Sequence, residues 1–358
     1  MKITQDGETH TIFVDPYNAE IIGQLNDQHR IIDRVEEFHG ELMLGTYGDL
    51  IVELVACWTL ALVLTGIYLW RPKKMRVFGV FLPRLKARKR TFIRDLHAVP
   101  GVWLSIAIVF LVFTGLLWTG NWGTKFQNLT TNSGFGYPPS IWVGSAPSSE
   151  VQTKDIADVP WAAETLEVPT SNQNGYLPVS VDEVVNIADQ QEIYPTYEVI
   201  YPQTDDGVYT ISVFPPKARD EATMHIDQYT GAILADYRYD NYQPLGKLMA
   251  WGITVHKGLE YGLINQIIGL IVCLGIIGLV IGGTVLWWKR KPDGHFGAPR
   301  SNSIVKIRGL LIILIIFSII FPVFGLSVLV IFFIDWLIIR RIPKLKHVFH
   351  GPPSKGGM

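Results

Sequence analysis

The sequence predicts an α-helical membrane protein with about three long spans, a C-terminal membrane hairpin, a small α+β domain outside the membrane and an internal repeat. Of its 358 residues, 48% are hydrophobic and only 18% are charged, a balance typical of membrane proteins. Several apolar runs reach the roughly 20 residues that a helix needs to cross a bilayer. Two histidine-to-tryptophan stretches also match at a constant spacing, which pairs His39, Gly66, Leu69 and Trp70 with His256, Gly283, Leu286 and Trp287.

The repeat begins before the membrane helix of each copy. Residues 11–15 and 20–23 read as two strands joined by the turn Pro16-Tyr-Asn-Ala19, and residues 224–227 and 232–235 repeat this pattern around Gln228-Tyr-Thr-Gly231. A repeat of this length is typical of two copies of one architectural unit. We expect a pseudo-twofold axis along the membrane normal to relate them.

Three apolar segments, 50–70, 102–118 and 263–288, are predicted to cross the membrane. The first contains a single acid, Glu53, which we expect to snorkel toward the interface rather than to catalyse. The apolar positions from 304 to 339 are too many for one span, and Pro322 interrupts them. Both ends of this region are basic, so we predict a helical hairpin that turns at Pro322.

Charge is segregated along the chain, although the formal net charge is only -1. The loop after the first span, residues 289–308 and the C-terminal tail are rich in Lys and Arg, whereas residues 121–250 are acidic. Basic loops remain in the cytoplasm. We therefore expect a multi-pass membrane protein, with the lipid bilayer as a partner, the basic loops in the cytoplasm and the acidic segment outside. The basic run 84–90 indicates topology and contact with anionic lipid, not nucleic acid.

The segment outside the membrane becomes regular after residue 178. Residues 181–189 have helical spacing, and strands are expected near 195–202, 207–214, 222–228 and 231–237. A helix followed by an antiparallel meander is a small α+β module.

Three histidines are expected to begin membrane helices, His39 and His256 at the outer surface and His97 at the inner one. A neutral imidazole that faces the interior of a helix bundle is a suitable axial ligand for haem iron, and the repeat makes His39 and His256 a pair. Glycines near these histidines, Gly40, Gly101 and Gly258, would let a flat macrocycle approach the backbone closely. The alternatives are a snorkelling interfacial histidine and, less favoured, zinc, for which no tetrahedral set of ligands is present.

Aromatic residues at the start of the outer segment are candidates for holding a substrate over the outer histidines. They include Trp122, Tyr137 and Trp142. The competing interpretation is that they anchor the domain on the membrane surface, as tryptophan and tyrosine commonly do.

Five motifs at the helix ends are distinctive. They are His39-Gly-Glu-Leu-Met-Leu-Gly-Thr-Tyr-Gly48, Leu64-Thr-Gly-Ile-Tyr-Leu-Trp-Arg-Pro72, Arg94-Asp-Leu-His-Ala-Val-Pro-Gly-Val-Trp103, Phe113-Thr-Gly-Leu-Leu-Trp118 and Leu286-Trp-Trp-Lys-Arg-Lys-Pro292. Together they resemble the PepSY-associated transmembrane family of bacterial inner-membrane proteins, which implies a place in the inner (cytoplasmic) membrane. The resemblance implies one or two haem b groups and reduction of ferric iron, in a ferric siderophore or another ferric chelate, on the periplasmic side. Electrons would come from a quinol or flavin donor on the cytoplasmic side.

Compared with this family, the sequence is expected to be shortened at its N-terminus, where a first membrane helix with a further histidine would stand. His39 and His256 would then form a complete outer pair of haem ligands, whereas His97 would lack its partner at an inner haem. The expected organisation is a periplasmic remnant of a first PepSY-like unit at 1–38, a membrane helix of repeat one at 39–72, a basic cytoplasmic loop at 73–96, a membrane helix at 97–119, a periplasmic PepSY-like domain at 120–250, a membrane helix of repeat two at 251–292, a cytoplasmic loop at 293–303, a C-terminal membrane hairpin at 304–341 and a cytoplasmic tail at 342–358.

Two other functions compete with electron transfer. One is a non-enzymatic membrane module whose PepSY-like domain binds or regulates a periplasmic protein. The other is a transporter, but the spans lack the interrupted helices and midplane charges that transporters use.

Overall fold

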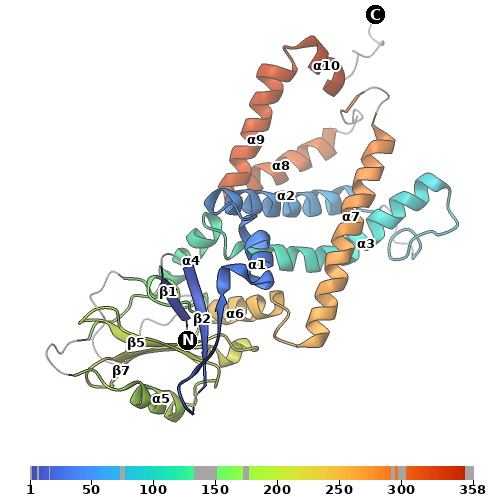
Figure 1. The fold of residues 1–358 in the computed structure, drawn as a ribbon. Coiled ribbons are helices and arrows are strands. Elements are labelled where there is room, and N and C mark those ends of the chain that lie inside the picture. Colours follow the sequence, from blue (N-terminus) through green and yellow to red (C-terminus); the bar gives the residue numbers. More distant parts are fainter. Residues whose placement is uncertain are drawn as a thin grey trace, which may run out of the picture.

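The computed structural model describes residues 2–5, 8–15, 17–72, 77–132, 151–171, 177–291, 295–296 and 304–350 (Figure 1). The strands are β1 (Lys2–Gln5), β2 (Glu8–Val14), β3 (Ile21–Asn26), β4 (Glu198–Ile200), β5 (Val208–Val213), β6 (Ala222–Asp227) and β7 (Ile233–Arg238). The helices are α1 (Ile31–Glu41), α2 (Thr46–Trp70), α3 (Lys89–Leu116), α4 (Trp122–Asn132), α5 (Val181–Gln190), α6 (Pro244–His256), α7 (Leu263–Arg290), α8 (Ile304–Ile320), α9 (Pro322–Ile334) and α10 (Pro343–His350).

Four helical segments in the described part of the chain are long and apolar enough to cross a membrane. They are Thr46–Trp70, Lys89–Leu116, Leu263–Arg290 and Pro322–Ile339, the last of which joins α9 to a π-helical turn. α8 is a shorter apolar helix beside them. The prediction of a multi-pass helical membrane protein is confirmed. The boundaries differ, because α3 already begins at Lys89, inside the segment predicted to be a loop to residue 96.

The predicted break near Pro322 is confirmed. α8 ends at Ile320 and α9 begins at Pro322, since proline lacks the N–H that would continue the α8 ladder. The indole Nε1 of Trp122 donates to the carbonyl oxygen of Ile320 at 3.2 Å, so this carbonyl at the break has a partner. Phe321 and Phe324 are buried there, and α8 and α9 contact each other and α2. The two helices therefore form one packed unit.

The prediction that Glu53 snorkels to the interface is wrong. Its side chain is 0% exposed, and its two carboxylate oxygens accept hydrogen bonds from the backbone N–H of Trp122 at 3.0 Å and from Asn121 Nδ2 at 3.1 Å. One helical turn earlier, Asp49 accepts from the N–H of Gly120 at 2.9 Å. Both acids lie on the face of α2 that meets the α3–α4 connection, because positions four apart share a helix face. The N–H groups of Gly120 and Trp122 stand before or at the start of α4, where no carbonyl of that helix can accept from them, so the two carboxylates serve as their acceptors.

Outside the spans, the described residues form two antiparallel sheets, which lie near each other at one end of the molecule (Figure 1). Their strand orders are β1-β2-β3 and β4-β5-β6-β7. α5 packs on the second sheet through a core that includes Val184, Ile211, Met224 and Ile226. Ser180 caps α5 by accepting from the N–H of Glu183. The predicted helix and four-stranded meander are confirmed, whereas β1 was not predicted.

Two hairpin turns share a closing hydrogen bond and a left-handed residue at matching positions. In the turns 15–20 and 227–232, the N–H of the first residue donates to the carbonyl of the last at 2.8 Å. The fifth residue of each is left-handed, Ala19 with φ 58° and Gly231 with φ 67°. The predicted repeat places these two turns at equivalent positions.

Two elbows ahead of membrane helices also match. Gly45 precedes α2 with φ 55° and ψ −138°, and Gly262 precedes α7 with φ 58° and ψ −137°. Side chains disfavour this combination strongly, so glycine is required at both points. Each elbow lets a short helix, α1 or α6, lie at an angle to the span that follows.

Candidate functional site

His39 and His256 lie on the short helices, not on the spans. His39 is in the last turn of α1, which ends where Leu42 becomes left-handed (φ 53°), and His256 is the last residue of α6. The expectation that they begin membrane helices is therefore wrong, because the elbows at Gly45 and Gly262 separate each histidine from its span. The structure nevertheless brings the two imidazoles together, with ring centroids 6.3 Å apart and planes at 57°.

His256 lies in the more enclosed environment of the two. Thr114 Oγ1 is 2.8 Å from its Nδ1, and the ring of Trp118 meets it edge-on with centroids 6.4 Å apart. Burial, followed by the nearby His39, lowers the pKa of His256. His256 is therefore neutral at neutral pH, the form that binds a metal. The His39 side chain is exposed.

The spacing of the pair fits one metal ion between the rings. A metal–imidazole bond is about 2.0–2.1 Å, so two imidazoles bound to one metal from opposite sides have ring centres about 6 Å apart. The observed 6.3 Å agrees with this value. No group of three or more potential ligands of the His, Cys, Asp or Glu type occurs among the residues described, so a zinc site has no support there.

His97 lies inside α3, not at its beginning, and packs against a pair of glycines in α7. A Cβ atom at Gly282 would lie 3.4 Å from its Nδ1, and one at Gly283 would lie 3.3 Å from its Cε1. Its Nδ1 is buried and has no hydrogen-bond partner within the described ranges. An orphaned buried nitrogen is uncommon and is consistent with a ligand position.

The three glycines expected to face a macrocycle have different surroundings. At Gly40, beside His39, an added Cβ would meet nothing within 4 Å, so space is open. At Gly101 it would lie 3.4 Å from Leu279 Cδ2, in the contact between α3 and α7. Gly258 has φ 77° and lies in the turn after α6. Only Gly40 borders free space next to a histidine.

The proposed substrate aromatics have no support here. Trp122 is only 9% exposed, because Phe113, Phe126 and Phe321 cover its ring with centroids 5.0 to 5.7 Å away. It is a core residue and has no surface to offer a substrate, which corrects the prediction. Tyr137 and Trp142 lie outside the described residues.

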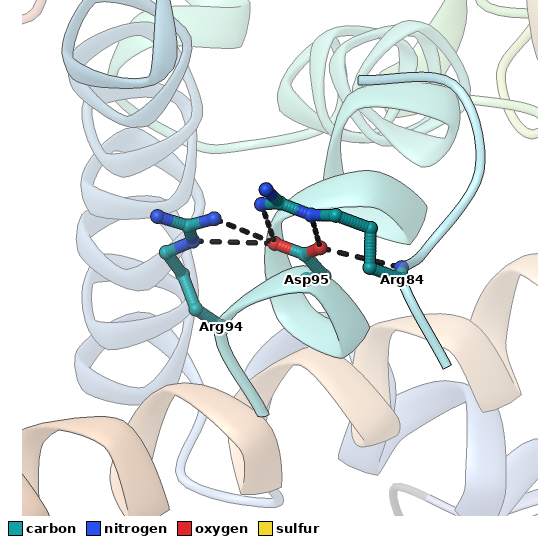
Figure 2. Close-up of polar contacts among 3 residues, drawn as sticks. All are labelled: Arg84, Arg94 and Asp95. Atoms are coloured by element: carbon teal, nitrogen blue, oxygen red, sulfur yellow. Dashed lines mark hydrogen bonds and ion pairs between the residues drawn. The ribbon is translucent and has the colours of Figure 1, made fainter. Parts of the chain in front are cut away.

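Near His97, the loop before α3 is fixed by a buried carboxylate (Figure 2). Asp95 is 1% exposed and accepts from Arg84 Nε at 2.7 Å, from Arg84 Nη2 at 3.0 Å and from Arg94 Nη2 at 2.9 Å. Trp103 Nε1 also donates to the carbonyl of Phe81, at 3.1 Å. The basic loop is therefore folded onto the end of α3 that carries His97.

A second buried acid, Glu221, lies near Glu260, where the larger sheet meets the elbow after His256. Glu260 accepts from Thr254 Oγ1 at 2.7 Å and from the N–H of Ala218 at 3.0 Å, which ties the elbow to the sheet domain. Burial, with a smaller effect of Glu260, raises the pKa of Glu221 to about 8, and Lys257 opposes this. Glu221 is thus protonated in the folded chain at neutral pH.

We expect stability to fall between pH 6.5 and 8. Glu221 has a folded pKa near 8 and an ordinary value of 4.5, so the folded chain retains a proton that the unfolded chain has released. The slope is at most about 1.4 kcal/mol per pH unit. Burial lowers the pKa of His225 from 6.5 to about 3. Below pH 6.5 the unfolded chain therefore binds a proton at His225 that the folded chain does not, and this contribution makes stability rise with pH only in that lower range. Because His225 contributes equally to both proteins, melting temperatures of the wild type and Glu221→Gln should diverge as the pH rises from 4.5 to 8, with Glu198→Gln as control; parallel curves would contradict this.

Sequence reasoning missed Thr114, Asp95 and Glu260. The first stands next to a glycine in Phe113-Thr-Gly115, and Asp95 is the first acid after a long basic run. Those contrasts mark unusual positions but do not reveal their partners.

A comparison with family models supports the assignment that these features suggest. The model described as the PepSY-associated TM region matches residues 1–290. No curated protein matches the chain in a sequence search. The matched range contains both short helices that carry the histidines, both sheets and three of the four candidate spans. The chain therefore belongs to the PepSY-associated transmembrane family.

Proposed function

We propose that this chain is a haem-b electron-transfer protein of the bacterial inner membrane that reduces ferric iron on the periplasmic side. Its substrate is iron in a siderophore or another ferric chelate, and its electrons come from a cytoplasmic quinol or flavin. The observation that carries the proposal is the pairing of His39 with His256 at 6.3 Å, from two separate helices at the end of the spans that faces the sheets.

Haem bound by this pair would supply a one-electron iron couple. The chain contributes two imidazoles from α1 and α6, and the neutral state of His256 leaves a nitrogen lone pair for the metal. The Trp118 ring lies edge-on to the His256 ring. Ferric iron is the substrate, and its reduction weakens the hold of hard oxygen ligands, so the chelate would release the metal.

His97 is proposed as a ligand at the opposite face. His97 and Thr114 both lie on α3, and the helical rise puts about 25 Å between them. Because Thr114 contacts His256, His97 is about as far from the outer pair. A single haem cannot span this distance. The buried Nδ1 of His97, for which no hydrogen-bond partner occurs among the described residues, supports a second haem near the basic loop, which lies at the far end of α3 from the sheets (Figure 1).

The matched hairpin turns and matched glycine elbows support a duplicated unit. We infer that β2–β3, α1 and α2 form one copy and that β6–β7, α6 and α7 form the other, related by a pseudo-twofold axis. Each copy then supplies one histidine of the pair. Under the positive-inside rule, the basic loop lies in the cytoplasm and the sheets lie in the periplasm.

Absorption spectra of the purified full chain and its histidine variants test this function. The wild type should show a Soret band and, when reduced, the sharp bands of a bis-histidine haem. His39→Ala and His256→Ala should each remove the outer haem, whereas His97→Ala should leave it. His29→Ala, on an exposed turn before α1, is the matched control.

Colourless wild-type protein from haem-replete cells would overturn the proposal. It would favour the alternative function, a non-enzymatic module whose sheet domain binds a periplasmic protein. If His97→Ala removed the outer signal and His256→Ala did not, the assignment of sides would be wrong.

A further inference from the structure

A residue on α3, Thr114, contacts one ring nitrogen of His256. Thr114 Oγ1 lies 2.8 Å from His256 Nδ1, and it also lies 2.8 Å from the carbonyl oxygen of Phe110 and 3.1 Å from that of Leu111. A hydroxyl has one proton, and a carbonyl oxygen can only accept. Donation of the Thr114 proton to the carbonyl of Phe110 leaves its oxygen as an acceptor for the Nδ1–H of His256.

We propose that Thr114 is a positioning residue that holds His256 as the Nδ1–H tautomer and leaves the Nε2 lone pair free for a metal. The part of this inference that concerns haem rests on the proposed function. A histidine that binds a metal usually donates its other ring N–H to an acceptor, which fixes the ring orientation and makes the ligand more basic. Thr114 acts in this way through His256, and the proposal gives it no bond to the metal.

The packing of α3 against α6 is built around this contact. A Cβ atom at Gly252 would lie 3.0 Å from Thr114 Cγ2, and one at Gly115 would lie 3.3 Å from Cε1 of His256. Both distances are tighter than ordinary van der Waals contact. The two glycines therefore let the helices approach until the hydroxyl and the imidazole are within hydrogen-bond distance.

The other histidine of the pair has no such support. His39 is exposed, and no hydrogen bond of its ring occurs among the residues that the structure describes. One ligand is thus fixed in advance, and the other is free to turn toward the metal. Changes at Thr114 should affect the bond from His256 and leave His39 unchanged.

Nitrogen NMR of the haem-free full chain with ¹⁵N-labelled histidine tests the tautomer directly, with the His256 signals assigned through His256→Gln. We expect the wild type and Thr114→Ser to show a protonated Nδ1. Thr114→Val, which keeps the volume but removes the acceptor, should show a shift toward protonated Nε2. An unchanged tautomer in Thr114→Val, or protonated Nε2 in the wild type, would overturn the proposal.

Titration of the same proteins with haemin tests the consequence. Loss of a partner of this kind commonly weakens metal binding 10- to 100-fold, and we expect a weakening of this size at the outer site in Thr114→Val. Thr114→Ser should restore tight binding, and melting temperatures show whether each variant is folded. If Thr114→Val does not fold, Thr114→Ala replaces it. Wild-type affinity in a folded variant that lacks the hydroxyl would contradict the inference, whereas a wild type without haem would contradict only the proposed function.

Discussion

Replacing both Arg84 and Arg94 with methionine is expected to lower the free energy of unfolding by about 3–5 kcal/mol. The reason is that Asp95, 1% exposed, would become a buried carboxylate without a cation. The arginine side chains are 41% and 47% exposed, so the carboxylate is the desolvated member of the cluster. Methionine keeps most of the apolar length of each side chain, and the loss therefore reports the charge.

The single variants should cost less than half as much, because the remaining arginine still donates to Asp95. Asp95→Ala should also cost less than the double variant, since the freed guanidinium groups can be hydrated. Chemical denaturation in detergent gives these free energies, with Arg88→Met in the same exposed loop as control. If Asp95→Ala destabilised the protein more than the double arginine variant, the Asp95 carboxylate would not be the desolvated member of the cluster.

Glu53→Leu is expected to destabilise the protein by about 3 kcal/mol. It removes the acceptors of the Trp122 N–H and the Asn121 side chain, and a buried donor left without a partner costs about 1–3 kcal/mol. Glu53→Gln keeps one carbonyl oxygen for the Trp122 N–H, so it should cost clearly less. The effect should be concentrated at the start of α4, where the amide of Trp122 should exchange faster with solvent.

Denaturation and hydrogen exchange of the two Glu53 variants measure this effect. Glu36→Gln, on the exposed side of α1, should remain within about 0.5 kcal/mol of the wild type. Equal losses in Glu53→Leu and Glu53→Gln would show that the charge of Glu53, and not its two hydrogen bonds, stabilises the connection between α2 and α4.

Much of the fold could be predicted because it depends on neighbouring residues. The apolar lengths of α2, α3 and α7 are visible in the sequence, and Pro322 removes an N–H wherever it stands. The helix α5 and the strands after it follow from the apolar periods of short segments. The errors at helix starts have the same origin, since Gly45 and Gly262 bend the chain through backbone angles that hydropathy does not report.

The candidate site was only partly predictable. The repeat marked His39 and His256 as equivalent, and the structure brings them together, while their role as ligands stays a prediction. Trp122 was misjudged because tryptophan at the end of a span is usually interfacial. Here a cluster of phenylalanines from α3, α4 and the α8–α9 break covers it.

By itself, the sequence determined the membrane class, the approximate spans, the break at Pro322 and the helix-and-meander domain, because each depends on the composition and period of contiguous residues. Only the tertiary structure decided that Glu53 is buried, that two arginines share Asp95 and that Thr114 holds His256. These pairings join distant positions, 142 residues apart for Thr114 and His256. The partner of a polar side chain is set by which helices pack together, and packing is a property of the whole chain.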